Sequence, residues 1–581
     1  MSNANRKSLK VIGSLDSVFV ILLILGCVFL SCRSFTAYAV QPKWYWLVGT
    51  VCLWGIYRLL RPGNSSNGRS SSFTVDWSSV GQFIICLYIL LRLLASEPVR
   101  ILWVCITVAA FTLFCIVGFT ANVTSERAGQ WACILAGGVL SGITLWQWFV
   151  HAGAVREITG PFDSPAGLAI CIAALFPFLL TEAFRTRGKY RIPFAILLSL
   201  NIAAVALTQS RTGVIAVAVV SGIFLYGRYA ERFKRRLKYP KAILSVILLA
   251  LVAASVFINT DSAKGRLLVW RITGDMVAER PLFGGGNGVF AARYMDAQAD
   301  FFREHPDHPT AMLADNVSYP FNEYLGFAAE YGWMGLGLCL LWVLLIVYRA
   351  EATSPYLLCL VAVGIASLFS YPFRYASTLL LVVWSLACLA RKRPQGGFAR
   401  TFRLSGAIRI ILALCLTGCQ CLMATDMRFE YRWGRLSRNT VNPNADTYRE
   451  LNAQWNGNPA FLYTYGSVLF HAGRYEECLP VLLSCRRYLD DYDVRMLLGA
   501  CYENLEKPSE AEKHYLQASL MCPNRFMPLY KLVGVYDSIG RPDRALDLAR
   551  EIVGKPEKVP SGMVAAIKLK MRQRAGCEPE R

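Results

Sequence analysis

Charged residues are scarce in this sequence. Of its 581 residues only 17% are charged, whereas 55% are apolar. Soluble domains carry about 25% charged residues, so this composition excludes an ordinary cytosolic enzyme, a disordered chain and a fibrous one. It is typical of a membrane protein.

Acidic residues are the scarcer of the two charged kinds, with 39 Asp and Glu against 61 Lys and Arg and a formal net charge of +22. Most of this excess lies before residue 425, between long apolar runs, where basic residues set the orientation of membrane spans. The high net charge therefore does not indicate nucleic-acid binding.

Paired cysteines of the metal-binding kind are also lacking. Most of the 19 cysteines lie in apolar runs, as Cys105 and Cys359 do, where they behave as small apolar side chains. The cysteines after residue 424 form no CxxC pair and are odd in number, which argues against a disulfide framework. We expect no structural metal and no cofactor.

Long apolar runs are what the sequence does have. A helix of about 20 apolar residues crosses the hydrocarbon core of a bilayer. The candidate spans centre on residues 17–32, 44–60, 81–96, 101–119, 131–150, 166–182, 193–208, 212–227, 242–259, 330–348, 355–371, 376–390 and 405–424. The predicted fold class is all-α, a polytopic helix bundle of about 12 to 13 spans over residues 1–424.

The basic loops predict the orientation of this bundle. The densest ones, at residues 185–191, 228–241 and 391–403, all follow even-numbered spans, so they share one side, which the positive-inside rule makes cytoplasmic. Residues 260–329 then form a large periplasmic loop. The small residues at 37–39 also fit cleavage of a signal peptide, which leaves the topology downstream unchanged.

A repeat follows the bundle. Gly466, Gly499 and Val533 recur at spacings of 33 and 34 residues, and small residues at such positions let paired helices approach closely. The pattern resembles the tetratricopeptide family, whose stacked repeats commonly bind a protein partner. The expected order is a connector at 425–457, repeats at 458–557 and a C-terminal tail at 558–581. We expect the repeats to fold separately, on the periplasmic side.

Two segments on the outside face suit a phosphate group. Arg211, in TQSRTG between two spans, offers a planar guanidinium beside hydroxyl groups, although a snorkelling interfacial arginine is the alternative. In GGGNG, Gly284 and Gly286 allow positive φ and close backbone approach to phosphate oxygens, although a sharp turn is equally compatible. The run lacks the Lys-Ser/Thr of a nucleotide-binding loop.

Together, the many-span bundle, the SRTG arginine, the large loop with RPLFGGGNGVF and the Asn-Glu-Tyr-Leu start of the next span resemble the O-antigen ligase/polymerase superfamily. This superfamily includes the bacterial O-oligosaccharyltransferases. The resemblance covers about residues 100–390 and implies a GT-C-like fold in the bacterial inner membrane.

The resemblance implies a glycosyltransferase. Family members take a glycan from undecaprenyl pyrophosphate at the periplasmic face, without nucleotide sugar or metal, and arginines hold the pyrophosphate. Here those arginines are Arg211 and either Arg266 or Arg271. The acceptor is a lipid A core or a protein; the alternative within the class is a polymerase that extends the lipid-linked glycan. The alternative of a different class is a transporter or a non-catalytic membrane scaffold.

One position departs from the motif of the ligases. That motif has a histidine followed by three positions that Asn322, Gly332 and Gly335 match in this sequence, and these three residues are called the motif frame. In this sequence Phe321 stands at the histidine position, and phenylalanine cannot deprotonate an acceptor.

Three side chains in the outside segment could replace that base, namely Glu323, His305 and His308. The alternatives are structural, since a carboxylate at a helix start complements the helix dipole and histidines beside prolines are common in exposed loops.

Overall fold

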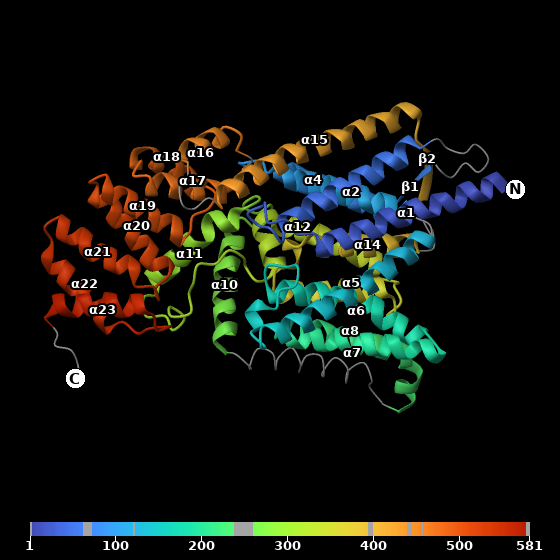
Figure 1. Cartoon of the computed structure of the whole chain (residues 1–581), viewed down its shortest axis with the longest axis horizontal. Helices are drawn as coiled ribbons and strands as arrows, with labels where there is room; N and C mark the ends of the chain where they lie inside the picture. Colours follow the sequence, from blue (N-terminus) through green and yellow to red (C-terminus); the bar gives the residue numbers. More distant parts are fainter. Residues whose placement is uncertain are drawn as a thin grey trace.

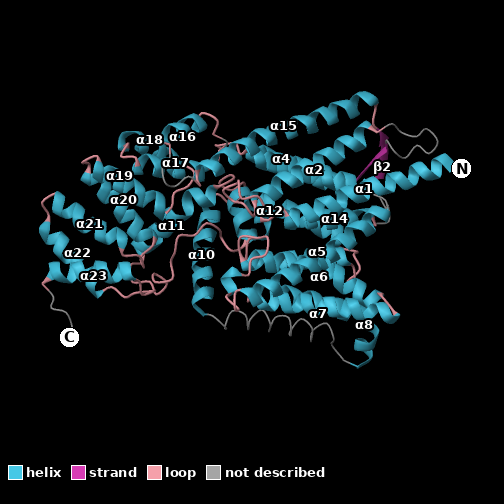
Figure 2. Cartoon of the chain, viewed as in Figure 1, coloured by secondary structure: helices cyan, strands magenta, loops and turns pink. Residues whose placement is uncertain are grey.

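The computed structural model describes residues 3–61, 72–119, 123–236, 260–392, 399–438, 444–455 and 457–576. Within these ranges the regular structure is helical except for one two-stranded sheet (Figure 2). The predicted all-α fold class is therefore confirmed.

Apolar helices form the bundle in the first three quarters of the chain. They are α1 (Asn3–Phe29), α2 (Gln41–Leu60), α3 (Trp77–Leu94), α4 (Ile101–Phe119), α5 (Val123–Val150), α6 (Pro165–Arg185), α7 (Arg191–Leu207), α8 (Arg211–Arg236), α12 (Glu323–Val347), α13 (Pro355–Phe369), α14 (Ala376–Arg391) and α15 (Gly406–Leu436). Each expected span within the described residues coincides with one of them, while the span expected at 242–259 lies outside those residues. Among the described residues, 8 of these helices are long and apolar enough to cross a membrane, while Leu15–Phe29 of α1, α13 and α14 are shorter apolar helices.

Helix α6 lies at the centre of the bundle. In its apolar window 83% of the residues are buried, compared with 17% for the window that contains α7. Ser164 begins α6 by accepting a hydrogen bond from the amide of Gly167, and residues along its whole circumference then pack into the core. A helix that is apolar all round is expected at such a place, whereas α7 turns most of its surface outward.

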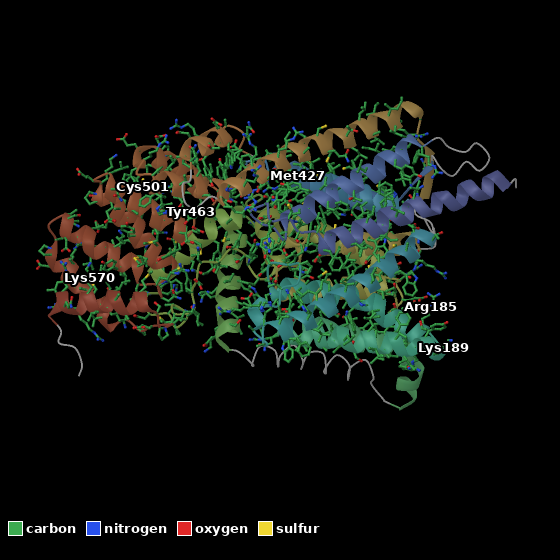
Figure 3. All side chains as sticks on the ribbon, in the orientation of Figure 1. Arg185, Lys189, Met427, Tyr463, Cys501 and Lys570 are labelled. Atoms are coloured by element: carbon green, nitrogen blue, oxygen red, sulfur yellow. The ribbon has the colours of Figure 1, made fainter. Side chains whose placement is uncertain are left out.

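Two loops pair at one end of the bundle. Strand β1 (Ser72–Asp76) runs antiparallel to β2 (Ala399–Arg403). These strands follow the expected spans two and twelve, so their pairing agrees with a topology in which even-numbered spans end on one side. Figure 3 shows Arg185 and Lys189 towards this end of the bundle and the repeats at the opposite end.

The expected large loop contains two helices, α10 (Thr260–Glu279) and α11 (Val289–Glu304). Figure 1 shows α10 running across the end of the bundle rather than along it. It contacts α12 and α11, and α11 in turn packs against the repeats.

The repeat region forms three helix pairs, one in each expected repeat. They are α17 (Pro459–His471) with α18 (Tyr475–Arg486), α19 (Tyr492–Asn504) with α20 (Pro508–Met521), and α21 (Met527–Ser538) with α22 (Pro542–Gly554). The repeated glycines explain the close packing, because a Cβ on Gly466 would lie 2.4 Å from Leu482 and one on Gly499 2.5 Å from Tyr515.

The repeats were expected to fold separately, and in the structure they pack against the large loop. Residues of α10 and α11 share one hydrophobic core with Tyr492, Met521 and their neighbours in the repeats. Because residues of both parts contribute to this core, the large loop and the repeats are packed together, and separate folding of the repeats stays a prediction.

Both expected borders around the repeats also differ from the observed helices. Helix α15 continues through residue 424, and α16 (Ala445–Asn452) follows in the connector. The expected tail contains α23 (Gly562–Ala575), whose Ile567 and Met571 are buried against the last repeat.

Candidate functional site

Arg211 and Arg266 line the same recess. It lies between the first turn of α8, the first turns of α10 and the end of α13. The lining residues are Arg211, Thr212, Ile215, Ser262, Ala263, Arg266, Leu267, Trp270 and Phe369. Two guanidinium groups over a largely apolar wall suit an anionic head group that carries a long hydrocarbon chain.

The turn before α8 places Arg211 in the lining of the recess. Gln209 adopts a left-handed backbone conformation with φ of 52°, which reverses the chain after α7. The hydroxyl of Ser210 then accepts a hydrogen bond from the amide of Gly213 at 3.4 Å. Arg211 is thus the first residue of α8, where the amides and the dipole of the helix favour negative charge.

The environment of Arg266 is unfavourable for a second positive charge. Burial lowers the pKa of its guanidinium, and the nearby charge of Arg211 lowers it further. The Arg266 guanidinium also lies 5.6 Å from the ring centre of Phe321. Two like charges held together in this way are stabilised by an anion bound between them.

Phe321 itself stands at the entrance to α12. Its backbone has a positive φ of 52°, which costs a non-glycine residue about 1–3 kcal/mol. Asn322 directly after it caps α12, because its side chain accepts hydrogen bonds from the amides of Tyr324 and Leu325 at 3.0 and 3.1 Å. The asparagine of the expected motif frame is therefore a helix cap.

The two glycines of the frame allow close approaches to α12, and Gly332 also breaks the helix. Gly332 has φ of 71°, and a Cβ there would lie 2.1 Å from the carbonyl oxygen of Leu282. A Cβ on Gly335 would lie 2.8 Å from the Tyr88 ring. Gly332 thus lets the Pro281–Gly288 segment dock onto α12, whereas Gly335 lets the Tyr88 ring of α3 approach.

The glycine run is engaged in this docking and not at the recess. The amide of Gly284 donates to the carbonyl of Arg280, and the amide of Gly286 donates to that of Glu330, each at 3.0 Å. Since both N–H groups have backbone partners, the pyrophosphate role expected for Gly284 and Gly286 finds no support in this geometry. The alternative, a sharp turn, describes them.

Arg271 and the two histidines form a different cluster. The Arg271 guanidinium lies 5.1 Å from the ring centre of Phe301, on which His305 stacks at 4.8 Å. His305 Nδ1 is 3.0 Å from the carbonyl of Phe301, and His308 Nδ1 is 2.8 Å from the Thr310 hydroxyl. Arg271, His305 and His308 are not among the residues that line the recess.

Glu323 is the first residue of α12, beside Phe321 and Asn322. Its Oε1 accepts a hydrogen bond from the amide of Phe373 at 2.9 Å, so the carboxylate ties the start of α12 to the loop after α13. The side chain is half-buried and does not line the recess.

Sequence reasoning missed the loop that follows α13. Arg374 donates to Asp163 Oδ2 at 2.6 Å, and the Tyr375 hydroxyl donates to Oδ1 of the same carboxylate at 2.8 Å. The ring of Tyr371 from this loop packs on Phe321 with a centroid distance of 5.8 Å. The available signal was an arginine among four aromatic or proline residues between two short apolar spans at the outside face.

The family model described as O-antigen ligase matches residues 194–340. This segment contains Arg211, Arg266, Phe321 and the glycines of the α12 break. The match confirms the resemblance for these residues, and with the apolar helices it supports a multi-pass membrane glycosyltransferase of the O-antigen ligase or polymerase type. The match is shorter than the resemblance expected at residues 100–390.

No curated protein matches the chain. Among solved structures, the crystal structure of the APC/C hetero-tetramer Cut9–Hcn1 shares 10% identity with a TM-score of 0.23, over 91% of this chain and 90% of that chain. A similarity this low carries no functional argument.

Proposed function

We propose that this protein transfers a glycan from undecaprenyl pyrophosphate to an acceptor at the periplasmic face of the bacterial inner membrane. The observation that carries the proposal is the shared recess of Arg211 and Arg266. Its location supports the proposed side, because the recess is formed at helix ends that the basic loops predict to be periplasmic.

The two arginines suit the departure of the lipid carrier. In the transfer, the bond between the sugar anomeric carbon and the pyrophosphate oxygen breaks, and the acceptor hydroxyl oxygen takes its place. Negative charge develops on the pyrophosphate, where the guanidinium groups and the start of α8 stabilise it. The apolar residues Ile215 and Phe369 in the wall would contact the first prenyl units.

The acceptor proton needs a destination, and Phe321 cannot take it. Glu323 is the ionisable residue next in the chain, and its carboxylate is held near the aromatic loop by the Phe373 amide. His305 and His308 are weaker candidates because their rings pack around Phe301, whereas Glu323 lies two residues after Phe321, whose ring contacts Arg266 of the recess. We assign the base to Glu323.

A polymerase that extends the lipid-linked glycan is the second candidate. The phenylalanine at the position of the ligase histidine favours it, since transfer then depends more on arginine electrostatics than on a base. The acceptor is accordingly a lipid A core, a protein or a growing glycan. The repeats would favour a protein acceptor or partner, although part of their surface is occupied by α11.

A strain lacking the gene tests the function. We expect it to accumulate lipid-linked glycan and to lose a surface polysaccharide or glycoprotein, and the wild-type gene to restore both. Arg266→Ala should not restore them, whereas Arg271→Ala on the same helix should, because Arg271 lies outside the recess.

The contrary results are equally definite. Unchanged surface glycans and lipid-linked intermediates in the deletion strain would support a transporter or scaffold of another pathway. Full restoration by Arg266→Ala, at equal protein level, would remove this recess from the reaction.

A further inference from the structure

Three aromatic rings lie in a row beside the recess. Tyr319 and Tyr371 stack with ring centres 4.7 Å apart, and Phe321 lies 5.8 Å from Tyr371. Tyr319 and Phe321 precede α12, whereas Tyr371 follows α13, so the fold brings two loops together to form the row. All three rings are half-buried, and none belongs to a hydrophobic core cluster of the described residues.

Charged groups stand at both ends of this aromatic row. At one end Arg266, which also lines the recess, lies over Phe321. At the other end the Arg374 guanidinium lies 5.0 Å from the ring centre of Tyr319 and pairs with Asp163 at 2.6 Å. The row therefore begins at the anion site and ends at an exposed Arg–Asp pair.

The row is not explained by folding alone. Aromatic rings that contribute little to a core leave apolar surface exposed, which is unfavourable unless a ligand covers it. The strained backbone of Phe321 holds one of these rings in place at a further cost.

A sugar ring has the complementary chemistry. Its axial C–H bonds form an apolar face with slight positive charge, which packs on the negative face of an aromatic ring, while its hydroxyl groups need polar partners at the edge. Aromatic walls with a few charged groups are typical of sites for small polar molecules.

We propose that Tyr319, Phe321 and Tyr371 bind the sugar rings next to the pyrophosphate, with Arg374 and Asp163 hydrogen-bonding to sugar hydroxyls. This assignment rests on the proposed function and adds to it a subsite for the glycan. It also gives Phe321 a role at the position where the ligases have histidine, namely substrate binding rather than proton transfer.

Two lipids that differ by one sugar test the subsite. We would measure the binding of undecaprenyl pyrophosphate, and of undecaprenyl pyrophosphate that carries one N-acetylglucosamine, to the full chain in nanodiscs. The wild type should bind the sugar-bearing lipid more tightly. Tyr319→Leu and Tyr371→Leu should each weaken that binding by about 3- to 10-fold and leave the bare lipid unchanged. Tyr371→Phe keeps the ring and should retain the difference.

Several outcomes would overturn the subsite while leaving the proposed function in place. The first is equal affinity of the wild type for both lipids, and the second is a difference in affinity that is unchanged in the leucine variants. The third is equally weakened binding of both lipids in these variants, which would assign the rings to the prenyl chain. Failure of the wild type to bind the bare lipid would instead overturn the proposed function together with this inference.

Discussion

The buried amide of Gln298 provides a sharp test of the contact between the large loop and the repeats. Gln298 accepts a hydrogen bond from the Tyr294 hydroxyl at 2.8 Å and donates to the carbonyl of Met521 in the repeats at 2.6 Å. It also donates to the carbonyl of Asp315 at 3.2 Å. Gln298→Ala removes all three bonds. Each buried polar group left without a partner costs about 1–3 kcal/mol, and local rearrangement reduces the sum. We therefore predict that the free energy of opening the contact between α11 and the repeats falls by about 3–5 kcal/mol.

Hydrogen exchange of the full chain in detergent measures this loss. If α11 and α20 open together, a decrease of about 3 kcal/mol in the free energy of opening makes the exchange of their backbone amide hydrogens about 100-fold faster. Gln517→Ala is the matched control, because its side chain donates to Asp296 at 2.9 Å at the edge of the same interface. Its exchange should increase by less than about tenfold, as expected for a bond accessible to water.

Equal protection of the α11 amides from exchange in Gln298→Ala and Gln517→Ala would refute the reasoning. It would mean that the loop holds its conformation without the repeats. Deletion of residues 440–581 should then leave lipid binding intact, whereas the shared core predicts that this deletion disorders α10 and α11 and weakens binding.

Three further predictions concern other parts of the chain. Gly332→Ala should destabilise the protein by more than about 3 kcal/mol in thermal unfolding, since the new Cβ would lie 2.1 Å from the carbonyl oxygen of Leu282. Gly337→Ala is the control and should be tolerated, because a Cβ there has no neighbour within 4 Å. Burial lowers the pKa of His514 to about 4, so the stability that neutral His514 contributes to the repeats should be complete above about pH 6.5 and fall by up to about 3 kcal/mol towards pH 4. Because burial raises the pKa of Asp490 to about 7 and gives a dependence of opposite sign, the measurement is the urea-unfolding difference between the wild type and His514→Gln as a function of pH. A difference that stays constant from pH 7 to pH 4 would contradict the prediction. Glu323→Gln should lower the transfer rate at least about 100-fold and change its pH profile, whereas His305→Ala should keep both; wild-type kinetics in Glu323→Gln would leave the reaction to the arginines.

The sequence predicts the spans and repeats well because both depend on local periodicity. Apolar length alone locates the membrane helices, and the 33- to 34-residue spacing locates the helix pairs. By contrast, the core between α11 and the repeats joins residues far apart in the chain, and no local pattern marks such a contact.

The candidate site was predictable only in part. Arg266 and Arg271 are five residues apart, which places them about 140° apart around a helix, so only one can face a given recess. The sequence does not show which face of α10 meets α8. Similarly, the spacing of Gly284 and Gly286 in the sequence fits a phosphate-binding loop. Only the structure shows that these glycines dock at the break in α12 around Gly332.

The central claim is that Arg211 and Arg266 hold one pyrophosphate, and a double-mutant cycle on glycan transfer in proteoliposomes tests it most directly. We predict that Arg211→Ala and Arg266→Ala each lower the transfer rate by about two to four orders of magnitude, with Arg211→Lys rescuing only in part. The double variant should lose much less than the product of the single losses, because both side chains act on the same group. Transfer near the wild-type rate in either alanine variant, or fully independent losses in the double variant, would contradict a shared pyrophosphate site.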